Sequence, residues 1–472
     1  MSTFAGKCQR DRASRIVSGS ASVPGYARSR HVRARIVFIY FAALASLPAC
    51  ATATRDRAWL ATATFERTQL RLGPRSLSAG AELPPKISLR DGIDSSEAVA
   101  VALWRSPALQ AELTNLDSAL ADFDEARRSA NPRFSFLAPI DPRQLALVLA
   151  WPIEAIWQVP LRTKAANREV ERVAESLVQI VLNLERDVRI AHADAYVARA
   201  RIAVLEAIAV AWRDAAVVVE ARARAGDIAP ADAAAIRAEA TIATDAITRA
   251  QHETVITEAR LLALLGAPWP TLPRLAPRAA STPTVVTRDQ LVAQAYRQRP
   301  DVRAAELAIH VAAARGKWER ARVFSLVATL DGQALSGQRK PYVSFGAQLD
   351  VPIFSQNQGG IGRADAAVAK AGYLYAASRI AVAMEVTSAL AATQRATTSL
   401  VAYDAVLRAL VDASKSARLA FEDGAESYLV VVDAMRREAD ARLRRIDLDA
   451  ELARAEAELA RAVGGILDPE TK

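Results

Sequence analysis

The chain has 472 residues, of which 51% are hydrophobic and only 6% aromatic, so it is long enough for more than one ordinary domain. Its formal net charge is +9. Residues 1–49 carry eight basic residues and one acidic residue, a net of +7, which leaves +2 for the rest of the chain. Because the positive charge is concentrated in this N-terminal segment, the composition argues against a nucleic-acid-binding surface.

Residues 1–49 have the pattern of a secretory signal peptide. A basic stretch from Arg28 to Arg35 precedes an apolar run, residues 36–47, that is too short to span a bilayer comfortably. The run ends in Leu47-Pro-Ala-Cys50, which resembles the lipobox of bacterial lipoproteins, where a cysteine is lipidated and becomes the new N-terminus. We therefore expect a lipoprotein-type signal peptide and lipidation at Cys50. The alternative is an incidental cysteine beside an ordinary cleavage site.

Residues 50–87 form an N-terminal arm. Alanine, threonine and arginine dominate its first part, and Pro84-Pro85 interrupt its end. This composition predicts an extended, weakly structured tether.

From residue 88 the chain repeats itself. The segment ending at Pro107 aligns with the segment ending at Pro300, and the turn at Gly226 aligns with the turn at Gly424. Each half has a helix after a proline corner, a strand pair, a very long helix, a glycine turn and a last helix. We expect repeats at 88–266 and 288–465, joined by a proline-rich linker at 267–287 and followed by a tail at 466–472.

The helices of the two repeats differ in length in a regular way. Residues 162–225 and 361–423 lack proline and each predict a helix of roughly 90 Å. The flanking helices are expected to be about half as long, near residues 95–130, 231–265, 288–321 and 427–463. Two short helices laid end to end match one long helix. This pattern fits either a tall wall of helices or an elongated helical bundle.

Residues 323–354 predict a β-hairpin with two different faces. On its second strand the apolar residues Val343, Phe345, Leu349 and Val351 alternate with the polar residues Ser344, Gln348 and Asp350. A second, less regular hairpin is expected near residues 133–151. Four short strands cannot close a barrel alone, and strands cross lipid only as closed barrels, so several chains have to contribute.

Together these features resemble the TolC-type outer-membrane efflux proteins of Gram-negative bacteria. The resemblance covers roughly residues 88–465 and is carried by four segments: Arg299-Pro-Asp-Val302, Val351-Pro-Ile-Phe354, Gly424 through Asp433-Ala434, and Ala462-Val-Gly-Gly465. It implies a mainly α fold with a small β part, in which a duplicated helix–hairpin–helix repeat forms a trimeric α-helical barrel continuing a transmembrane β-barrel. Residues 355–359 (Ser-Gln-Asn-Gln-Gly) resemble a region of the heavy-metal efflux branch.

The resemblance also implies a function. The chain is expected to be the exit duct of a tripartite efflux pump, conducting substrates passively from the pump and periplasm to the exterior. Its expected partners are two further copies of itself, a periplasmic adaptor, an inner-membrane pump of the RND type, and outer-membrane lipid. The expected location is the outer membrane, with a lipid anchor and an extension into the periplasm. The alternative is a periplasmic helical scaffold or adaptor lipoprotein without a pore.

Enzymatic chemistry is not expected. The four histidines have no partner at metal-ligand spacing, which favours structural or surface roles. The glycines at 359, 360 and 362 lack the Lys-Ser/Thr of a phosphate-binding loop and are expected to mark a strand-to-helix junction. We expect no catalytic residue, cofactor or metal.

The two glycine turns should lie at the end of the long helices opposite the strands, where a tube could close. In a trimer, each inward acid there becomes a ring of three charges. The resembled family has two acidic positions on the last helix near this turn; one matches Asp433, and the other is Val430 here. The alternative role for these acids is helix capping and solvated charge. The candidate gate residues are Asp433, Val430, Asp232, Asp227, Glu426 and Asp423.

Overall fold

The structure is a computed structural model. It describes residues 53–74, 83–85, 87, 92–137, 144–266, 269, 271–276, 287–335 and 342–465. These all belong to one compact unit, Ala53–Lys472. The expected signal peptide, Cys50, most of the linker and the tail at 466–472 lie outside the described residues.

The element order is the same in the two halves of this unit. The first half contains α3 (Ser95–Arg105), α4 (Pro107–Ala126), β1 (Arg133–Leu137), β2 (Gln144–Pro152), α5 (Ala155–Ala225) and α6 (Pro230–Leu265). The second half contains α7 (Arg288–Gln298), α8 (Pro300–Ala321), β3 (Ser325–Leu335), β4 (Tyr342–Asp350), α9 (Gln358–Glu422) and α10 (Tyr428–Val463). The predicted helix–hairpin–helix plan and both hairpins are therefore confirmed.

The expectation of a weakly structured arm is wrong for residues 57–68, which form helix α2 (Arg57–Thr68). The Asp56 side chain caps this helix by accepting a hydrogen bond from the Trp59 amide at 2.9 Å. Leu60 is fully buried, and Arg55 forms a 2.7 Å ion pair with Glu175 of α5. The arm is ordered because it has this packing partner, which local composition does not reveal.

The first helices of each half are also shorter than expected, because each is divided at a proline. The residues before Pro107 and Pro300 adopt extended ψ angles of 115° and 123°, as a following proline requires. Each proline then occupies the first position of the next helix, where its missing amide costs nothing. The long helices extend further than predicted at their N-termini. Helix α5 has 71 residues and includes Pro160 in its second turn.

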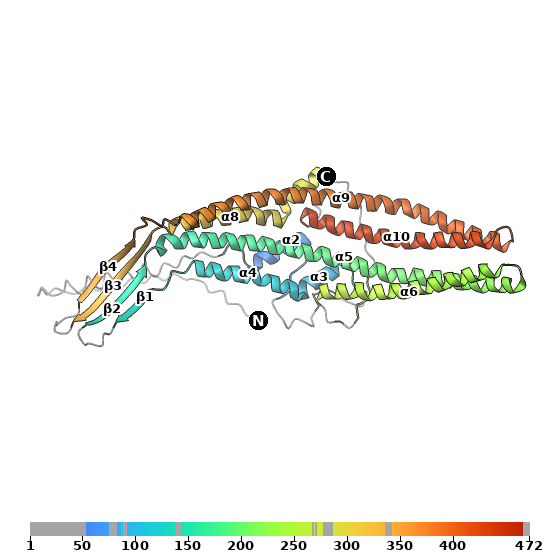
Figure 1. The fold of residues 1–472 in the computed structure, drawn as a ribbon, viewed down its shortest axis with the longest axis horizontal. Coiled ribbons are helices and arrows are strands. Elements are labelled where there is room, and N and C mark those ends of the chain that lie inside the picture. The colour runs from blue at the N-terminus through green and yellow to red at the C-terminus, as the bar shows by residue number, and fades with distance from the viewer. Residues whose placement is uncertain are drawn as a thin grey trace, which may run out of the picture. The chain divides into compact units, whose positions relative to one another are not determined.

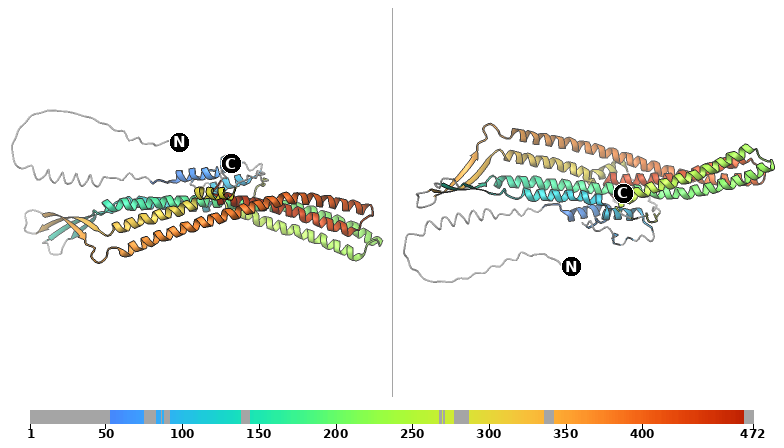
Figure 2. Two further views of the ribbon diagram at one scale, coloured as in Figure 1. Left: turned by 90° about the horizontal axis from the view of Figure 1, so that it is seen from above. Right: turned by 60° about the horizontal axis from the view of Figure 1, so that its bottom comes forward.

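The helices form a wall one layer thick rather than a solid bundle. Helices α4 and α6 lie along α5, α5 contacts α8 and α10, and these two lie along α9. Figure 1 shows the two short helices of each half following one another beside the long one. The strands lie at one end of this unit and the α5–α6 and α9–α10 turns at the other (Figures 1 and 2). Helix α9 and the α4–α6 pair are thus the two edges of the wall.

Buried side chains follow the seams between helices instead of filling one central core. One seam near the glycine turns contains Trp212, Ile236 and Val432. Another, near the middle of α9, contains Leu291, Val386 and Val463. Many of the other buried residues are alanines, which allow close helix approach.

Candidate functional site

The four strands form one antiparallel sheet in the order β1-β2-β3-β4. The two hairpins therefore join through the β2–β3 pair, in which Leu149 lies opposite Leu330. Among the described residues, β1 and β4 each pair with a strand on one side only. Two free edges on a short sheet are a template for pairing with further strands.

The register gives this sheet one apolar face. Residues directly opposite in antiparallel strands project to the same side. One row of the apolar face consists of Phe134, Leu149, Leu330 and Phe345. The next row consists of Phe136, Leu147, Gly332 and Val343. Phe345 is 74% exposed, so the chain leaves this face largely uncovered.

The opposite face is polar or small. Its central row consists of Ser135, Val148, Asp331 and Ser344, and Gln348 and Asp350 lie on the same side of β4. Strand β2 is nearly all apolar in sequence, so its two faces are not evident there. The register places its large residues, Leu147, Leu149 and Trp151, on the Phe345 face and the smaller Ala146, Val148 and Ala150 on the polar face.

The junction from the sheet to α9 explains the glycine cluster. Asn357 has a positive φ of 55°, and its Nδ2 donates to the Glu319 carbonyl oxygen at 2.9 Å and to Glu319 Oε2 at 2.8 Å. A Cβ at position 360 would lie 2.3 Å from Asn357 Oδ1. Glycine at 360 therefore makes room for a strand-to-helix junction, as predicted.

All six candidate gate residues lie at the end of the wall opposite the sheet, and all are exposed. Gly226 and Gly424 make the two turns, with φ angles of +85° and +75°. Asp433 Oδ2 lies 2.8 Å from Arg437 Nη2, one helical turn away, and Val430 is 43% exposed. The sequence patterns did not point to this basic partner; the i,i+4 spacing of Asp433 and Arg437 was the available signal.

The two helical hairpins are tied together near these turns. The Arg222 guanidinium of α5 lies 4.2 Å from the centre of the Phe421 ring of α9. Arg436 of α10 forms an ion pair with Glu239 of α6. Arginines from both halves therefore hold the two helical hairpins together at this end of the wall. Neither of these arginines was singled out from the sequence.

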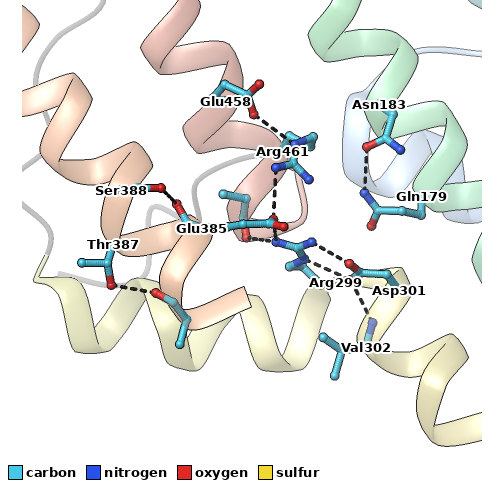
Figure 3. A network of polar contacts seen from close by, with 12 residues as sticks. Gln179, Asn183, Arg299, Asp301, Val302, Glu385, Thr387, Ser388, Glu458 and Arg461 are labelled. Atoms are coloured by element: carbon cyan, nitrogen blue, oxygen red, sulfur yellow. Dashed lines mark hydrogen bonds and ion pairs between the residues drawn. The ribbon is translucent and has the colours of Figure 1, made fainter. Parts of the chain in front are cut away.

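A polar network lies midway along α9, where α8 and α10 meet (Figure 3). Its centre is Arg299, which is 2% exposed. The guanidinium donates to Asp301 at 2.5 and 3.0 Å, to Glu385 of α9 at 2.6 Å, and to the Ala462 carbonyl oxygen of α10 at 3.3 Å. Arg461 donates to the same Glu385 oxygen at 3.0 Å. Arg299 thus joins three helices, which gives the Arg299-Pro-Asp-Val segment a structural role.

This network changes the ionisation of Glu385. Partial burial opposes charge on its carboxyl group, but the hydrogen bonds and positive charges of Arg299 and Arg461 outweigh that effect and lower its pKa.

His192 of α5 is buried, and its Nε2 lies 2.9 Å from the Ile93 carbonyl oxygen, so this nitrogen carries the proton. Burial lowers the pKa of His192. Its contacts are those of a structural histidine. Within the described part of the chain, no group of three or more His, Cys, Asp or Glu side chains is arranged to hold a metal ion.

The comparisons with known proteins agree with this geometry. The family model for "outer membrane efflux protein" matches residues 291–465. No curated protein matches the sequence.

Several solved structures are similar over most of their length. CusC, described for "conformational changes accompanying folding and transmembrane channel formation", is 20% identical, with a TM-score of 0.67, covering 79% of this chain and 92% of CusC. The Campylobacter jejuni outer-membrane channel CmeC is 15% identical, with a TM-score of 0.69, over 83% of this chain and 90% of CmeC. The open state of the Neisseria gonorrhoeae outer-membrane channel MtrE is 19% identical, with a TM-score of 0.65, over 78% and 88%.

The matched family and these structures are channel proteins, which fits the expectation of a protein that is not an enzyme. At these identities the structural likeness concerns the fold, which the chain shares over both halves. Residues 291–465 match the family model for outer membrane efflux proteins, and the chain shares the TolC-like fold of these outer-membrane channels over both halves.

Proposed function

We propose that three copies of this chain form an outer-membrane channel that serves as the exit duct of a tripartite efflux pump. The observation that carries the proposal is the four-stranded sheet, which has one apolar face and two free edges and stands at the end of a one-layer helical wall. Pairing β4 of each copy with β1 of the next closes the sheet into a barrel of twelve strands, and a closed barrel satisfies every backbone group in lipid.

In this barrel the apolar face turns outward to lipid. Val343, Phe345, Leu349 and Val351 face the membrane on this reading, whereas Ser344, Gln348 and Asp350 face the water-filled lumen. The exposure of Phe345 and Val343 in the single chain supports the assignment, because a soluble protein would bury such residues.

The helical wall continues this barrel as a tube. Helix α9, at one edge of the wall, leaves Tyr373, Ile380 and Met384 exposed along one stripe. Among the described helices, α9 is also the one that is long and apolar enough in composition to cross a membrane. A neighbouring copy covering this stripe accounts for an apolar helix surface at an edge of the wall.

The tube conducts passively, and its cargo is set by an adaptor and an inner-membrane pump of the RND type. The Ser355–Gly359 segment supports a place in the heavy-metal branch. The candidate gate residues at the glycine turns form the closable periplasmic end, where Asp433 contributes charge and Val430 an apolar constriction.

The lipid anchor on Cys50 completes the proposal. Four residues further on, the Thr54 amide donates to Asn167 Oδ1 at 3.1 Å. Asn167 lies 12 residues into α5 from its sheet end, about 18 Å along the helix. The start of the described arm is therefore held near the sheet end of α5, which supports an anchor just upstream of it in the sequence.

The assignment of faces is tested by placing a lysine on each side of β4. Phe345→Lys puts a charge in lipid, which costs up to about 2–4 kcal/mol near the bilayer midplane, whereas Gln348→Lys leaves the charge in water. We expect Phe345→Lys to reduce the heat-resistant trimer in outer-membrane fractions strongly and Gln348→Lys to leave it nearly unchanged. The reverse ranking would contradict the proposed faces.

A conductance measurement distinguishes an outer-membrane channel from a periplasmic scaffold or adaptor without a pore. Purified protein in planar bilayers should form pores if the chain is a channel. A soluble periplasmic monomer without conductance would instead favour the scaffold or adaptor reading.

A further inference from the structure

A cleft of about 350 Å³ lies between α5, α9 and α10, in the half of the wall nearer the glycine turns. Its walls come from both repeats. Ile208 and Trp212 of α5 and Met435 of α10 supply apolar surface, and Lys415 and Arg418 of α9 line the same space. The volume lies within the range of small-molecule sites.

The two cations are adjacent on one helix face, three residues apart. Both are exposed, and neither lies within ion-pair distance of a carboxylate among the described residues. The other charges lining the cleft are Arg442 and Glu438, which neutralise each other at 2.6 Å. The cleft therefore carries a net positive charge from Lys415 and Arg418.

A second observation concerns the residue that directly precedes Lys415 on α9. Ser414 also lines the cleft and is 1% exposed, and its Oγ has no hydrogen-bond partner among the described residues. A buried hydroxyl without a partner is uncommon, because leaving it unsatisfied costs free energy. Many exposed lysines and arginines are simply solvated. These two differ because an apolar cavity and an unsatisfied donor lie beside them.

We propose that this cleft binds an amphipathic organic anion, one in each protomer. A carboxylate or sulfonate lies between Lys415 and Arg418, and an apolar ring or chain lies against Ile208, Trp212 and Met435. A bound anion connects α9 to α5 and α10, and thereby stabilises the contact between the two repeats. The inference concerns binding alone, so it stands or falls independently of the channel activity proposed above.

The test uses the purified, full-length assembly in nonionic detergent and isothermal titration calorimetry at low ionic strength. The probe is naphthalene-1-sulfonate, and 1-naphthylmethylammonium serves as a probe of similar size and opposite charge. Detergent alone is titrated as the blank. We expect one sulfonate per protomer and at least tenfold weaker binding of the ammonium probe.

Two variants locate the site. Lys415→Gln/Arg418→Gln should weaken sulfonate binding at least tenfold, equivalent to about 1.4 kcal/mol. The matched control Lys370→Gln/Arg408→Gln removes two exposed cations from the same helix outside the cleft, and should leave binding within twofold. Ala211→Trp fills the cleft without changing charge and should also weaken binding.

Absence of sulfonate binding overturns the proposal, as does equal binding of the two probes. An equal loss in both double variants also overturns it, because the effect would then be general electrostatics. Circular dichroism and trimer gels on each variant confirm that losses are not due to misfolding.

Discussion

The two helix corners, at Ser106–Pro107 and Arg299–Pro300, have the same backbone shape but are stabilised in different ways. Their preceding residues have φ and ψ of −55° and 115° in the first half and −69° and 123° in the second. Ser106 caps α4 locally, because its hydroxyl accepts a hydrogen bond from the Leu109 amide at 3.4 Å. Arg299 makes no such cap and instead binds Asp301, Glu385 and the end of α10.

The feature that both corners share is a backbone contact with the last helix of the same half. A Cβ on Gly266 would lie 2.7 Å from Pro107 Cδ and 2.9 Å from Ser106 Cα. A Cβ on Gly464 would lie 3.0 Å from the Arg299 amide nitrogen. Each half therefore has the same joint, a glycine after the last helix packed closely against the proline corner, but the side chains around the two joints differ. We therefore expect different substitutions to destabilise the two joints.

The largest effect is expected from Arg299→Leu. Removing a buried guanidinium that joins three helices takes a donor from Asp301, from Glu385 and from the Ala462 carbonyl oxygen, and leaves Glu385 paired with Arg461 alone. We expect a loss of about 3 kcal/mol, toward the low end for broken buried pairs, because Asp301 and Glu385 are partly exposed and can be hydrated. Thermal unfolding followed by circular dichroism measures it. A variant as stable as the parent would show that the network is not what fixes this corner.

The next effect is expected from alanine at the joint glycines. Gly266→Ala and Gly464→Ala combine a left-handed conformation with a close contact, whereas Gly226 and Gly424 are left-handed but a Cβ added there would meet no described atom within 4 Å beyond the adjoining residues. We expect about 1 kcal/mol at the two turns and more at the two joints. Comparing the four unfolding midpoints checks this order, and equal losses at all four sites would contradict it.

A smaller effect is expected from Ser106→Ala. Loss of a helix cap typically costs about 1 kcal/mol, and the neighbouring contacts of Gly266 with the corner are unaffected. Ser106→Thr, which keeps the hydroxyl, is the control. If Ser106→Ala destabilises as much as Arg299→Leu, the distinction between a local and a tertiary corner is wrong.

The smallest effects are expected from pH, and they differ between the halves. In the first half the pKa of His192 is lowered below its ordinary 6.5. The stability that the neutral, buried imidazole contributes is therefore fully present above pH 6.5 and is lost as the pH falls below that value. In the second half the pKa of Glu385 is lowered below its ordinary 4.5. The stability that its charged carboxylate contributes is therefore present above pH 4.5 and is lost only below that value. Unfolding midpoints between pH 7 and 5 should fall modestly, and His192→Gln should reduce that slope. An unchanged slope would exclude His192 as the source.

Much of the fold could be predicted from the sequence because its signals are periodic and local. The alternation around Phe345 predicted a two-faced strand, and the long proline-free segments predicted the long helices. Helix α2 was missed because its order depends on contacts with α5 such as the Arg55–Glu175 ion pair. The breaks at Pro107 and Pro300 were visible as prolines, but continuous helices were expected across them.

For the candidate site, too, one part could be predicted from the sequence and another could not. The location of the gate residues at the far end of the wall followed from the order of helices and turns, whereas the pairing of Asp433 with Arg437 emerged from the structure. The roles of these residues, and the lipidation of Cys50, stay predictions.

The sequence by itself determined that the chain is a duplicated helix–hairpin–helix protein, because repeats, hydrophobic period and proline positions are properties of single segments. Only the tertiary structure decided how the segments combine. It joined the two hairpins into one sheet through β2 and β3, assigned the nearly uniform residues of β2 to two faces, and showed Arg299 as the centre of a three-helix joint. The physical reason is that strand register and buried ion pairs are fixed by partners far away in the chain, which no local pattern specifies.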